Sequence, residues 1–335
     1  MKVTIKDIAR VAKVSIATVS KVVNCKDQHI SDATRQRVLA IINELNYVPN
    51  RIASSMITKN TFTIALVIPD IRNPFFPELA RGVEDYANQA GYHLVLCNSD
   101  NNPKKESTYI YMLQEKMVDG IIITSTSANN IEESVRHNIR IDIPVITVDR
   151  DLANFRTKGK ILVDNVAGAF DAVSFMIEKG YRKIVHLSGT INSTPSVQRL
   201  EGYRKALEYN NIEFNPDLYL EGTYDIEFGY EGIKKIIDKK IDFDSVFCGN
   251  DLIAIGAMKA AKELGYKVPS EIGVMGFDNS YLAGLVSPSL STVNQPNYQM
   301  GYKAAELLIN YIKNPSEPHN EVVLKTELVI RESTR

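Results

Sequence analysis

The sequence lacks the features that would place the chain in a membrane or cross-link it covalently. It contains no apolar run near the roughly 20 residues that cross a bilayer. Cys25, Cys97 and Cys248 are far apart and form no CxxC pair, which argues against a disulfide framework and against a zinc site. Lys2 and Lys6 fall where a signal peptide would need an apolar segment. We therefore expect a cytoplasmic protein with reduced thiols.

The motifs of the common catalytic and nucleotide-binding sites are also absent. No GxxxxGK[ST], GxGxxG, GxSxG or HExxH pattern occurs, and the histidines are scattered along the chain. His186 lies inside the apolar run KIVHLS, where we expect an imidazole that packs in the core. The sequence thus predicts no catalytic residue, no metal site and no cofactor, and we do not expect an enzyme.

The net charge of -1 conceals an uneven distribution of charge. Residues 1–60 carry +6, so the remaining residues must carry -7. A basic segment on an acidic body is typical of a polyanion-binding domain joined to a ligand-binding domain, although a chance excess of surface lysine and arginine is the alternative. At 335 residues and 44% hydrophobic content, the chain is long enough for two or three globular domains.

Three short helices are predicted within the basic segment. Thr4 is an N-cap candidate for the run IKDIARVA, and Ser15 starts a second run, IATVSKVV, only about three residues later. Two helices joined by so tight a turn form a helix-turn-helix. Ser31 stands before a third helix, DATRQRVLAIINELNY. We expect their shared core to contain Ile5, Ile8, Ala9, Val11, Ala12, Val19, Val22, Val23, Val38, Ile41, Ile42 and Leu45.

The second predicted helix presents a face that suits the major groove of DNA. A lysine can donate to the O6 and N7 atoms of guanine, and small apolar side chains contact the methyl group of thymine. Hydroxyl groups and backbone amides at a helix start hold phosphates. The side chains expected on this face are Ile16, Ala17, Ser20 and Lys21, with Ser15 and Thr18 at the helix start. The alternative is a solvated helical hairpin without a ligand.

From residue 62 onward, short β-rich runs alternate with helical stretches. The predicted strands are TIALVI, HLVLC, GIIIT, PVITV and KILV, followed by a second series of KIVHLS, SVFC and GVMGF, with helices near 196–211, 226–239 and 250–265. Two such series predict two doubly wound α/β lobes with a cleft between them. The later run LSTVNQPNYQMGYKAAELLINYI is expected to return to the first lobe.

Polar and aromatic side chains follow several of these strands, at the edge where ligands of parallel sheets bind. Carboxylates, amides and an arginine can bond vicinal hydroxyls, and an aromatic ring packs on the apolar face of a sugar. This mixture of polar and aromatic side chains therefore favours a polyol as the ligand. Each Asp or Asn taken alone, however, is more often a helix cap or turn former. The residues at these strand ends are Asp70, Asn73, Phe75, Phe76, Asp149, Arg150, Asp164, Asn165, Asn250, Asp251, Asp278 and Asn279.

The chain resembles the lactose-repressor and galactose-repressor family of bacterial regulators in VTIKDIARVAKVSIATVSKVVN and ISDATRQRVLAIINELNYVPNRIA. The resemblance continues through NPFF, VDR, DNVAGAF, QRLEGYRKAL, CGNDLIAIGAM, IGVMGFDN, STVNQPNYQMGYKAAELL and ELVIRES. It implies a multidomain fold, with an all-α helix-turn-helix DNA-binding domain and an α/β two-lobed domain like the periplasmic binding proteins. We predict these domains at 1–48 and 62–335, joined by a hinge at 49–61, with lobes at about 62–162 plus 293–325 and at about 163–292.

The resemblance implies that Ile16, Ala17 and Lys21 enter the major groove. The turn position that is usually glycine in the family is Lys13 here, and a left-handed backbone would cost up to about 1 kcal/mol relative to glycine. The position that is usually arginine in the family is Lys21 here, and lysine lacks the bidentate fork of arginine.

In the family a hinge helix opens the minor groove with a leucine, which Met56 replaces here. A helix of about two turns would order only against a partner, and the alternative is a flexible linker. The predicted DNA contacts are completed by Thr4, Asn24, His29, Asn50 and Ala53.

For the effector, the resemblance implies that Phe76 stacks on the ligand and that Arg199 clamps its polar edge. Asn250 and Asp278 would accept hydroxyl groups, and the predicted walls are completed by Asn73, Phe75, Asp149 and Tyr224. The expected function is that of a homodimeric repressor that reads pseudo-palindromic operator DNA and responds to a small sugar or sugar derivative, without a membrane partner. A free sugar-binding protein is the alternative. The sequence neither predicts nor excludes a phosphocarrier co-regulator.

Overall fold

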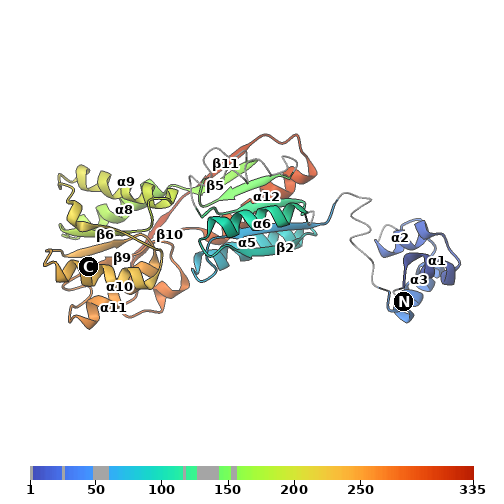
Figure 1. Cartoon of the computed structure of the whole chain (residues 1–335), viewed down its shortest axis with the longest axis horizontal. Coiled ribbons are helices and arrows are strands. Elements are labelled where there is room, and N and C mark those ends of the chain that lie inside the picture. Colours follow the sequence, from blue (N-terminus) through green and yellow to red (C-terminus); the bar gives the residue numbers. More distant parts are fainter. Residues whose placement is uncertain (1–2, 25–26, 48–59, 116–117, 127–142, 152–156) are drawn as a thin grey trace. The chain divides into compact units, whose positions relative to one another are not determined.

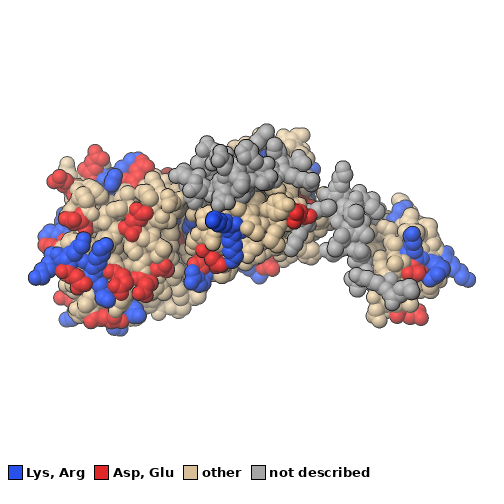
Figure 2. Space-filling model, in the orientation of Figure 1, with Lys and Arg blue, Asp and Glu red and all other residues tan. Residues whose placement is uncertain are grey.

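The structure is a computed structural model that describes residues 3–24, 27–47, 60–115, 118–126, 143–151 and 157–335. Contacts divide the chain into two units, residues 1–61 and residues 62–335. Figure 2 shows lysine and arginine side chains projecting from the first unit, which also carries some acidic side chains, and both signs of charge on the visible face of the second. Among the described residues, no helix is long and apolar enough to cross a membrane.

The first unit contains three helices: α1 (Ile5–Ala12), α2 (Ile16–Val23) and α3 (Asp32–Glu44). Thr4 caps α1 in a reciprocal capping box with Asp7, which satisfies two backbone amides at the helix start. The core consists of Ile8, Ala9, Ala12, Val19, Val22, Val38 and Ile41, with Ile5, Val23, Ile42 and Leu45 partly buried against it. This confirms the predicted core except for Val11, which is 50% exposed because it lies off the stripe formed by Ile8 and Ala12.

The turn between α1 and α2 depends on an unusual backbone conformation. Lys13 follows α1 with φ 53° and ψ 45°, and its amide donates to the carbonyl oxygens of Ala9 and Arg10. This confirms the left-handed turn expected at a position without glycine. Ser15 then begins α2, since its Oγ accepts a hydrogen bond from the Thr18 amide at 3.0 Å.

The first lobe of the second unit is built on a six-stranded parallel sheet in the order β11-β5-β4-β3-β1-β2. The strands are β1 (Thr63–Ile68), β2 (His93–Asn98), β3 (Gly120–Ile123), β4 (Val145–Val148), β5 (Gly159–Val163) and β11 (Asn320–Leu324). Helices α5 (Phe75–Gln89) and α12 (Asn297–Lys313) pack on one face through residues such as Leu79, Met300 and Leu308. Helix α6 (Pro103–Glu115) packs on the other face through Ile110 and Leu113.

The second lobe has a four-stranded parallel sheet in the order β7-β6-β8-β9. Its strands are β6 (Ile184–Ser188), β7 (Tyr219–Glu221), β8 (Ser245–Cys248) and β9 (Gly273–Met275). Figure 1 shows α8 (Asn165–Glu178) and α9 (Thr194–Tyr209) on one side of this sheet, with α10 (Ile226–Asp238) and α11 (Asp251–Glu263) on the other. The predicted α/β alternation is therefore confirmed in both lobes.

The chain passes between the lobes three times. It enters the second lobe after β5, returns to the first after β10 (Thr292–Asn294) and enters the second again after β11. Strand β10 pairs antiparallel with β12 (Glu327–Val329). Beyond β12, Ser333 is fully buried and bonds β9, because its Oγ donates to the carbonyl oxygen of Val274 at 2.6 Å. The C-terminal residues are thus part of the second lobe.

Candidate nucleic-acid interface and ligand pocket

Helix α2 buries one side and exposes the other. Val19 and Val22 pack in the core, whereas Ile16, Ala17 and Lys21 are exposed. Ile16 is 45% exposed, so its apolar side chain is available for a contact outside the domain. An apolar contact and a single cation therefore share the free face of this helix.

The hydroxyl and amide groups near this face have local partners. Ser15 caps α2 and its Oγ lies 2.9 Å from that of Thr18, while Asn24 Nδ2 donates to the carbonyl oxygen of Ser20 at 2.7 Å. Ser15, Asn24 and His29 are exposed, and Thr18 and Ser20 are half-buried. Thr4 is exposed at the start of α1. The predicted contacts Asn50, Ala53 and Met56, with the hinge helix, lie outside the described residues.

Two acidic side chains of the first unit, Asp7 and Asp27, pair with neighbouring arginines. Arg10 Nη2 lies 2.8 Å from Asp7 Oδ1, and Arg35 Nε lies 2.9 Å from Asp27 Oδ2. The hydrogen bonds from Thr4 hold the pKa of Asp7 below its usual value, with help from Arg10. Lys21 is not part of either pair, so its charge is available to an external anion or acceptor.

In the second unit, a pocket lies at the carboxyl ends of the strands of both lobes, with an empty volume of about 260 Å³. Its walls consist of Asn73, Phe75, Phe76, Asp149, Arg150, Pro195, Arg199, Tyr224, Asp278 and Gln295.

Arg199, on α9, is held on several sides. Its Nε donates to Asn165 Oδ1 at 2.9 Å and its Nη1 donates to the carbonyl oxygen of Gly249 at 2.5 Å. Its guanidinium carbon lies 3.7 Å from the centre of the Phe277 ring. The side chain is only 4% exposed. These contacts fix the orientation of the guanidinium without a ligand.

Asp278 faces Arg199 from the end of the segment after β9. Its Oδ1 lies 3.8 Å from Arg199 Nη1 and accepts a hydrogen bond from Gln295 Nε2 at 2.6 Å. Burial raises the pKa of Asp278 to about 8, against the opposing effect of Arg199, and the charge of Asp251 contributes. A carboxyl group with so high a pKa can accept or donate a hydrogen bond near neutral pH, which suits a hydroxyl ligand.

The residues after β4 form the opposite wall. Asp149 has φ 66°, and its Oδ2 lies 3.6 Å from Arg150 Nε. The guanidinium carbon of Arg150 lies 5.9 Å from the centre of the Tyr224 ring, which belongs to the second lobe. Tyr224 is itself held by Ser196, with 2.6 Å between the two hydroxyl oxygens. Arg150 therefore links the two lobes across the pocket.

The aromatic wall follows β1. Asn73 Oδ1 accepts a hydrogen bond from the amide of Phe75, the first residue of α5, at 3.1 Å. Phe75 and Phe76 are buried, with ring centres 5.0 Å apart at an angle of 82°. Their rings give the pocket an apolar side next to its charged groups.

The pocket brings together all of the predicted effector residues except Asn250. That side chain is buried and caps α11 instead, because its Oδ1 accepts from the Ile253 amide at 2.9 Å. The predicted set omits Arg150, Pro195 and Gln295. Arg150 directly follows Asp149 in the sequence, whereas Gln295 follows β10, a strand outside the predicted alternation.

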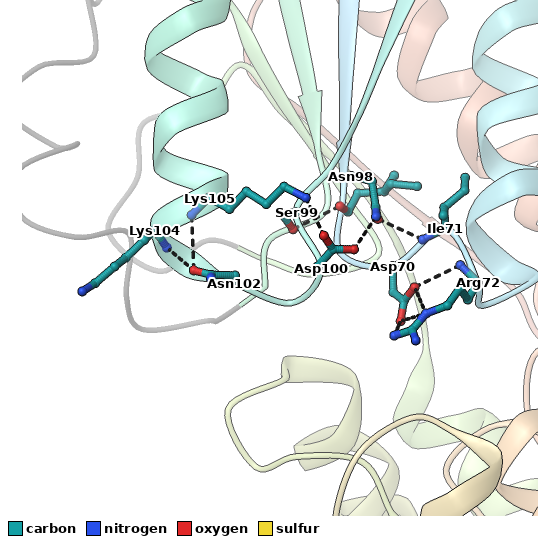
Figure 3. A network of polar contacts seen from close by, with 10 residues as sticks. Asp70, Ile71, Arg72, Asn98, Ser99, Asp100, Asn102, Lys104 and Lys105 are labelled. Atoms are coloured by element: carbon teal, nitrogen blue, oxygen red, sulfur yellow. Dashed lines mark hydrogen bonds and ion pairs between the residues drawn. The ribbon is translucent and has the colours of Figure 1, made fainter.

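Other polar residues at strand ends have structural partners. Asp70 pairs with Arg72 at 2.8 Å, beside a network in which Asp100 accepts a hydrogen bond from Asn98 Nδ2 at 2.6 Å and pairs with Lys105 (Figure 3). Asp164 caps α8, and Asp251 accepts hydrogen bonds from Ser280 and Thr292. None of them lines the pocket. No group of acidic, His or Cys residues in the described ranges is arranged to hold a metal ion.

Comparisons with known proteins match both units. A family described as bacterial regulatory proteins, lacI family, matches residues 4–50, and one described as a periplasmic binding protein-like domain matches residues 173–334. The chain is 37% identical to the transcriptional regulator RegA of Clostridium saccharobutylicum, and the match covers all of both chains.

Two solved structures are similar to the chain. A lac repressor dimer bound to operator and an anti-inducer is 26% identical with a TM-score of 0.88, covering 100% of this chain and 99% of that one. A regulator from Alkaliphilus metalliredigens complexed with D-xylulofuranose is 33% identical with a TM-score of 0.70, covering 82% of this chain and 99% of that one. The likeness to the operator complex extends over both units of the chain.

Proposed function

The chain belongs to the lacI family of bacterial regulatory proteins and is a DNA-binding transcription regulator, and we propose that a small sugar or sugar derivative controls its binding to a pseudo-palindromic operator. The observation that carries the effector part is the pocket, where paired acids and arginines stand beside two phenylalanines. Hydrogen-bonding groups next to an apolar ring surface are the complement of a sugar. The similar regulator complexed with D-xylulofuranose supports this ligand class.

For the DNA, we propose that α2 reads base edges. Lys21 would donate to guanine and Ile16 with Ala17 would contact a thymine methyl, since these side chains share the exposed face of the helix. Ser15, Thr18 and the first amides of α2 would contact phosphates, where the positive end of the helix also attracts anions. The proposal includes a cytoplasmic location, because the protein must reach its operator DNA, and it includes no catalytic step.

We propose a homodimer, because a symmetric pair of reading helices matches two half-sites. The similar lac repressor structure is a dimer. In this chain Tyr281 and Leu285, at the 3-10 helix η2 (Tyr281–Gly284), are 72% and 74% exposed. Two large apolar side chains exposed so close together indicate a contact surface. Leu285→Asp is expected to yield monomers in sedimentation analysis, whereas Tyr209→Asp on α9, a residue 76% exposed, is expected to leave the dimer intact.

The proposed control is a shift in population between two arrangements of the lobes. Arg150 of the first lobe and Tyr224 of the second meet at the pocket, so a ligand there contacts both sides. It would favour the lobe arrangement that it binds better and thereby change the spacing of the two DNA-binding units. By linkage, operator binding must alter effector affinity by the same factor.

The test combines sequence selection with effector titration. The full chain is offered a pool of random duplexes at modest salt, with and without a panel of sugars, sugar acids and sugar phosphates. We expect a pseudo-palindromic sequence to be enriched and one sugar class to change its affinity. A folded sample that prefers no duplex under any condition would contradict the DNA part. Equal effector affinity with and without operator would contradict the coupling.

A further inference from the structure

Asp278 reaches the pocket from a turn whose backbone is unfavourable for the residues that form it. Asp278 has φ 111° and the next residue, Asn279, has φ 54°. Positive φ values cost free energy for a residue with a side chain, and they persist only where surrounding contacts fix them. These two residues, the Asp278 turn, must therefore be held by other parts of the chain.

One set of contacts to the Asp278 turn comes from β10, the second crossing between the lobes. The Asp278 amide donates to the carbonyl oxygen of Val293 at 2.8 Å. The Asn279 amide donates to Thr292 Oγ1 at 3.3 Å, and Asn279 Nδ2 donates to Asn294 Oδ1 at 2.9 Å. The turn is thus aligned along the segment that leads back to the first lobe.

The other contact comes from Arg331, which follows β12 and so lies at the end of the third crossing. Its Nη2 donates to Asn279 Oδ1 at 2.7 Å, and its Nη1 donates to the carbonyl oxygen of Leu290 at 2.7 Å. Its amide also donates to Ser291 Oγ at 2.8 Å. Leu290 and Ser291 directly precede β10. One half-buried side chain therefore joins the Asp278 turn to both crossings.

The chemistry of these contacts requires an arginine. A guanidinium offers several N–H groups in a fixed plane, so it can bond two acceptors in different segments at once, whereas a lysine has a single nitrogen. Hydrogen bonds from a charged donor are also stronger than those between neutral groups. Without Arg331, the side chain of Asn279 would lose this bond, and the strained turn could relax and move Asp278 away from Arg199.

We propose that Arg331 is a positioning residue that holds the Asp278 turn against the two crossings, so that the placement of this carboxylate and the arrangement of the lobes depend on each other. The inference rests on the proposed function, because it names a residue that regulates the same pocket. Arg331 is not among the residues that line the pocket, so it acts on a ligand only through Asn279 and Asp278.

The experiment is a double-mutant cycle on the full chain, with Arg331→Met and Asn279→Gly alone and together. Methionine removes the donors, and glycine removes the amide that Arg331 contacts while adopting φ 54° without steric cost. Hydrogen exchange of the amides of residues 276–283 reports on the turn without a ligand. Calorimetry with D-ribose, D-xylulose, D-glucose, D-fructose and cellobiose measures sugar affinity, with and without the duplex that the full chain selects.

Arg331→Met is expected to accelerate exchange of the turn about tenfold and to weaken the sugar that the wild type binds best about tenfold. The factor by which the duplex changes sugar affinity should also fall toward one. In the Asn279→Gly background, Arg331→Met should change sugar affinity by less than about twofold. Arg335→Met is the control, because it removes a guanidinium of the same C-terminal segment that contacts Ser270 instead, and it should leave the turn and the sugar affinity unchanged.

An equal loss of sugar affinity in both backgrounds would overturn the inference, because Arg331 would then act through the stability of the lobe and not through Asn279. Unchanged exchange of the turn in Arg331→Met would overturn it too. If that variant does not fold, Arg331→Lys replaces it and should show a smaller loss that again disappears with Asn279→Gly. If a folded wild type binds none of the sugars, the sugar effector is contradicted, and the exchange of the turn alone decides for or against the role of Arg331.

Discussion

Arg199 and Asp278 lie 3.8 Å apart, between Nη1 and Oδ1, at a point where α9 meets the segment that follows β9. Each is nearly fully buried, and Arg199 also stacks on Phe277, the residue before Asp278. Arg199 also donates to Asn165 and to the carbonyl oxygen of Gly249, so the loss of Asp278 would leave it with hydrogen-bond partners. The pair is thus both a part of the pocket wall and a part of the second-lobe core.

Asp278→Ala is expected to abolish the response to effector while operator binding without effector is retained. The variant loses a hydroxyl acceptor and leaves Arg199 and Gln295 without their common partner. Operator affinity with and without the active sugar, measured by fluorescence anisotropy, checks this result. A variant that still responded to the sugar would remove Asp278 from the site.

Lys21→Ala is expected to cost about 1 to 3 kcal/mol of operator affinity, concentrated at one base pair of each half-site. The lysine is the cation on the exposed face of α2, next to Ile16 and Ala17. Binding to a set of operators with single base changes provides the measurement. A uniform loss on all sequences would make Lys21 a phosphate contact. Lys21→Arg serves as the matched variant, because its bidentate fork should sharpen the preference for guanine.

Lys13→Gly is expected to stabilise the first unit by about 0.5 to 1 kcal/mol. Lys13 has φ 53°, a left-handed conformation that glycine adopts without steric cost. Hydrogen exchange of the amides in α1 and α2, followed by mass spectrometry on the full chain, reports local stability. Lys6→Gly, inside α1, should instead accelerate exchange, because glycine in a helix costs about 1 kcal/mol. Equal or faster exchange in Lys13→Gly would contradict the prediction.

His186 is expected to make the second lobe less stable in acid. Burial lowers the pKa of its imidazole from 6.5 to about 4, and Nδ1 lies 3.0 Å from the carbonyl oxygen of Phe247. Between pH 6.5 and 4, His186 is therefore protonated in the unfolded chain and neutral in the folded lobe. The free energy of unfolding falls as the pH falls, by about 3 kcal/mol over this whole range.

His186→Gln should remove this contribution while keeping a side chain able to donate to Phe247. The difference in urea unfolding free energy between wild type and variant, measured at pH 7, 6, 5 and 4, isolates it from the opposite effect of the buried acids. His93→Gln, at an exposed position on β2, is the control and should leave the slope unchanged. If the unfolding free energy of His186→Gln changed with pH as steeply as that of the wild type, the imidazole would not be the cause of the loss of stability in acid.

The sequence predicted those elements whose apolar pattern is long or strongly β-branched. The run TIALVI became β1 and the run KIVHLS contains all of β6, and both strands are fully or nearly fully buried. Strands β7 and β10 were missed because each has only three residues. None of the residues of β7 is fully buried, and β10 lies outside the strand-helix alternation. Strand β11, at the edge of its sheet, has largely exposed side chains and therefore lacks a clear apolar face.

The residues of the pocket could likewise be predicted only where they follow a predicted strand. Asp149 and Asp278 were found because they end predicted strands, whereas Gln295 follows the unpredicted β10 and reaches the pocket through its bond to Asp278. Asn250 also ends a strand, but its side chain caps the next helix. A strand-end position thus brings a residue near the pocket, and local hydrogen bonding decides whether its side chain faces the ligand.

The return of the chain to the first lobe has a consequence for its synthesis on the ribosome. All four strands of the second-lobe sheet precede residue 276, whereas the first-lobe core needs Met300, Ala304 and Leu308 of α12. The lobe that begins first must therefore wait, with the apolar side of β3, β4 and β5 not yet covered by α12, until the later lobe has been almost entirely translated. We expect nascent chains halted before α12 to depend on chaperones that shield this uncovered surface.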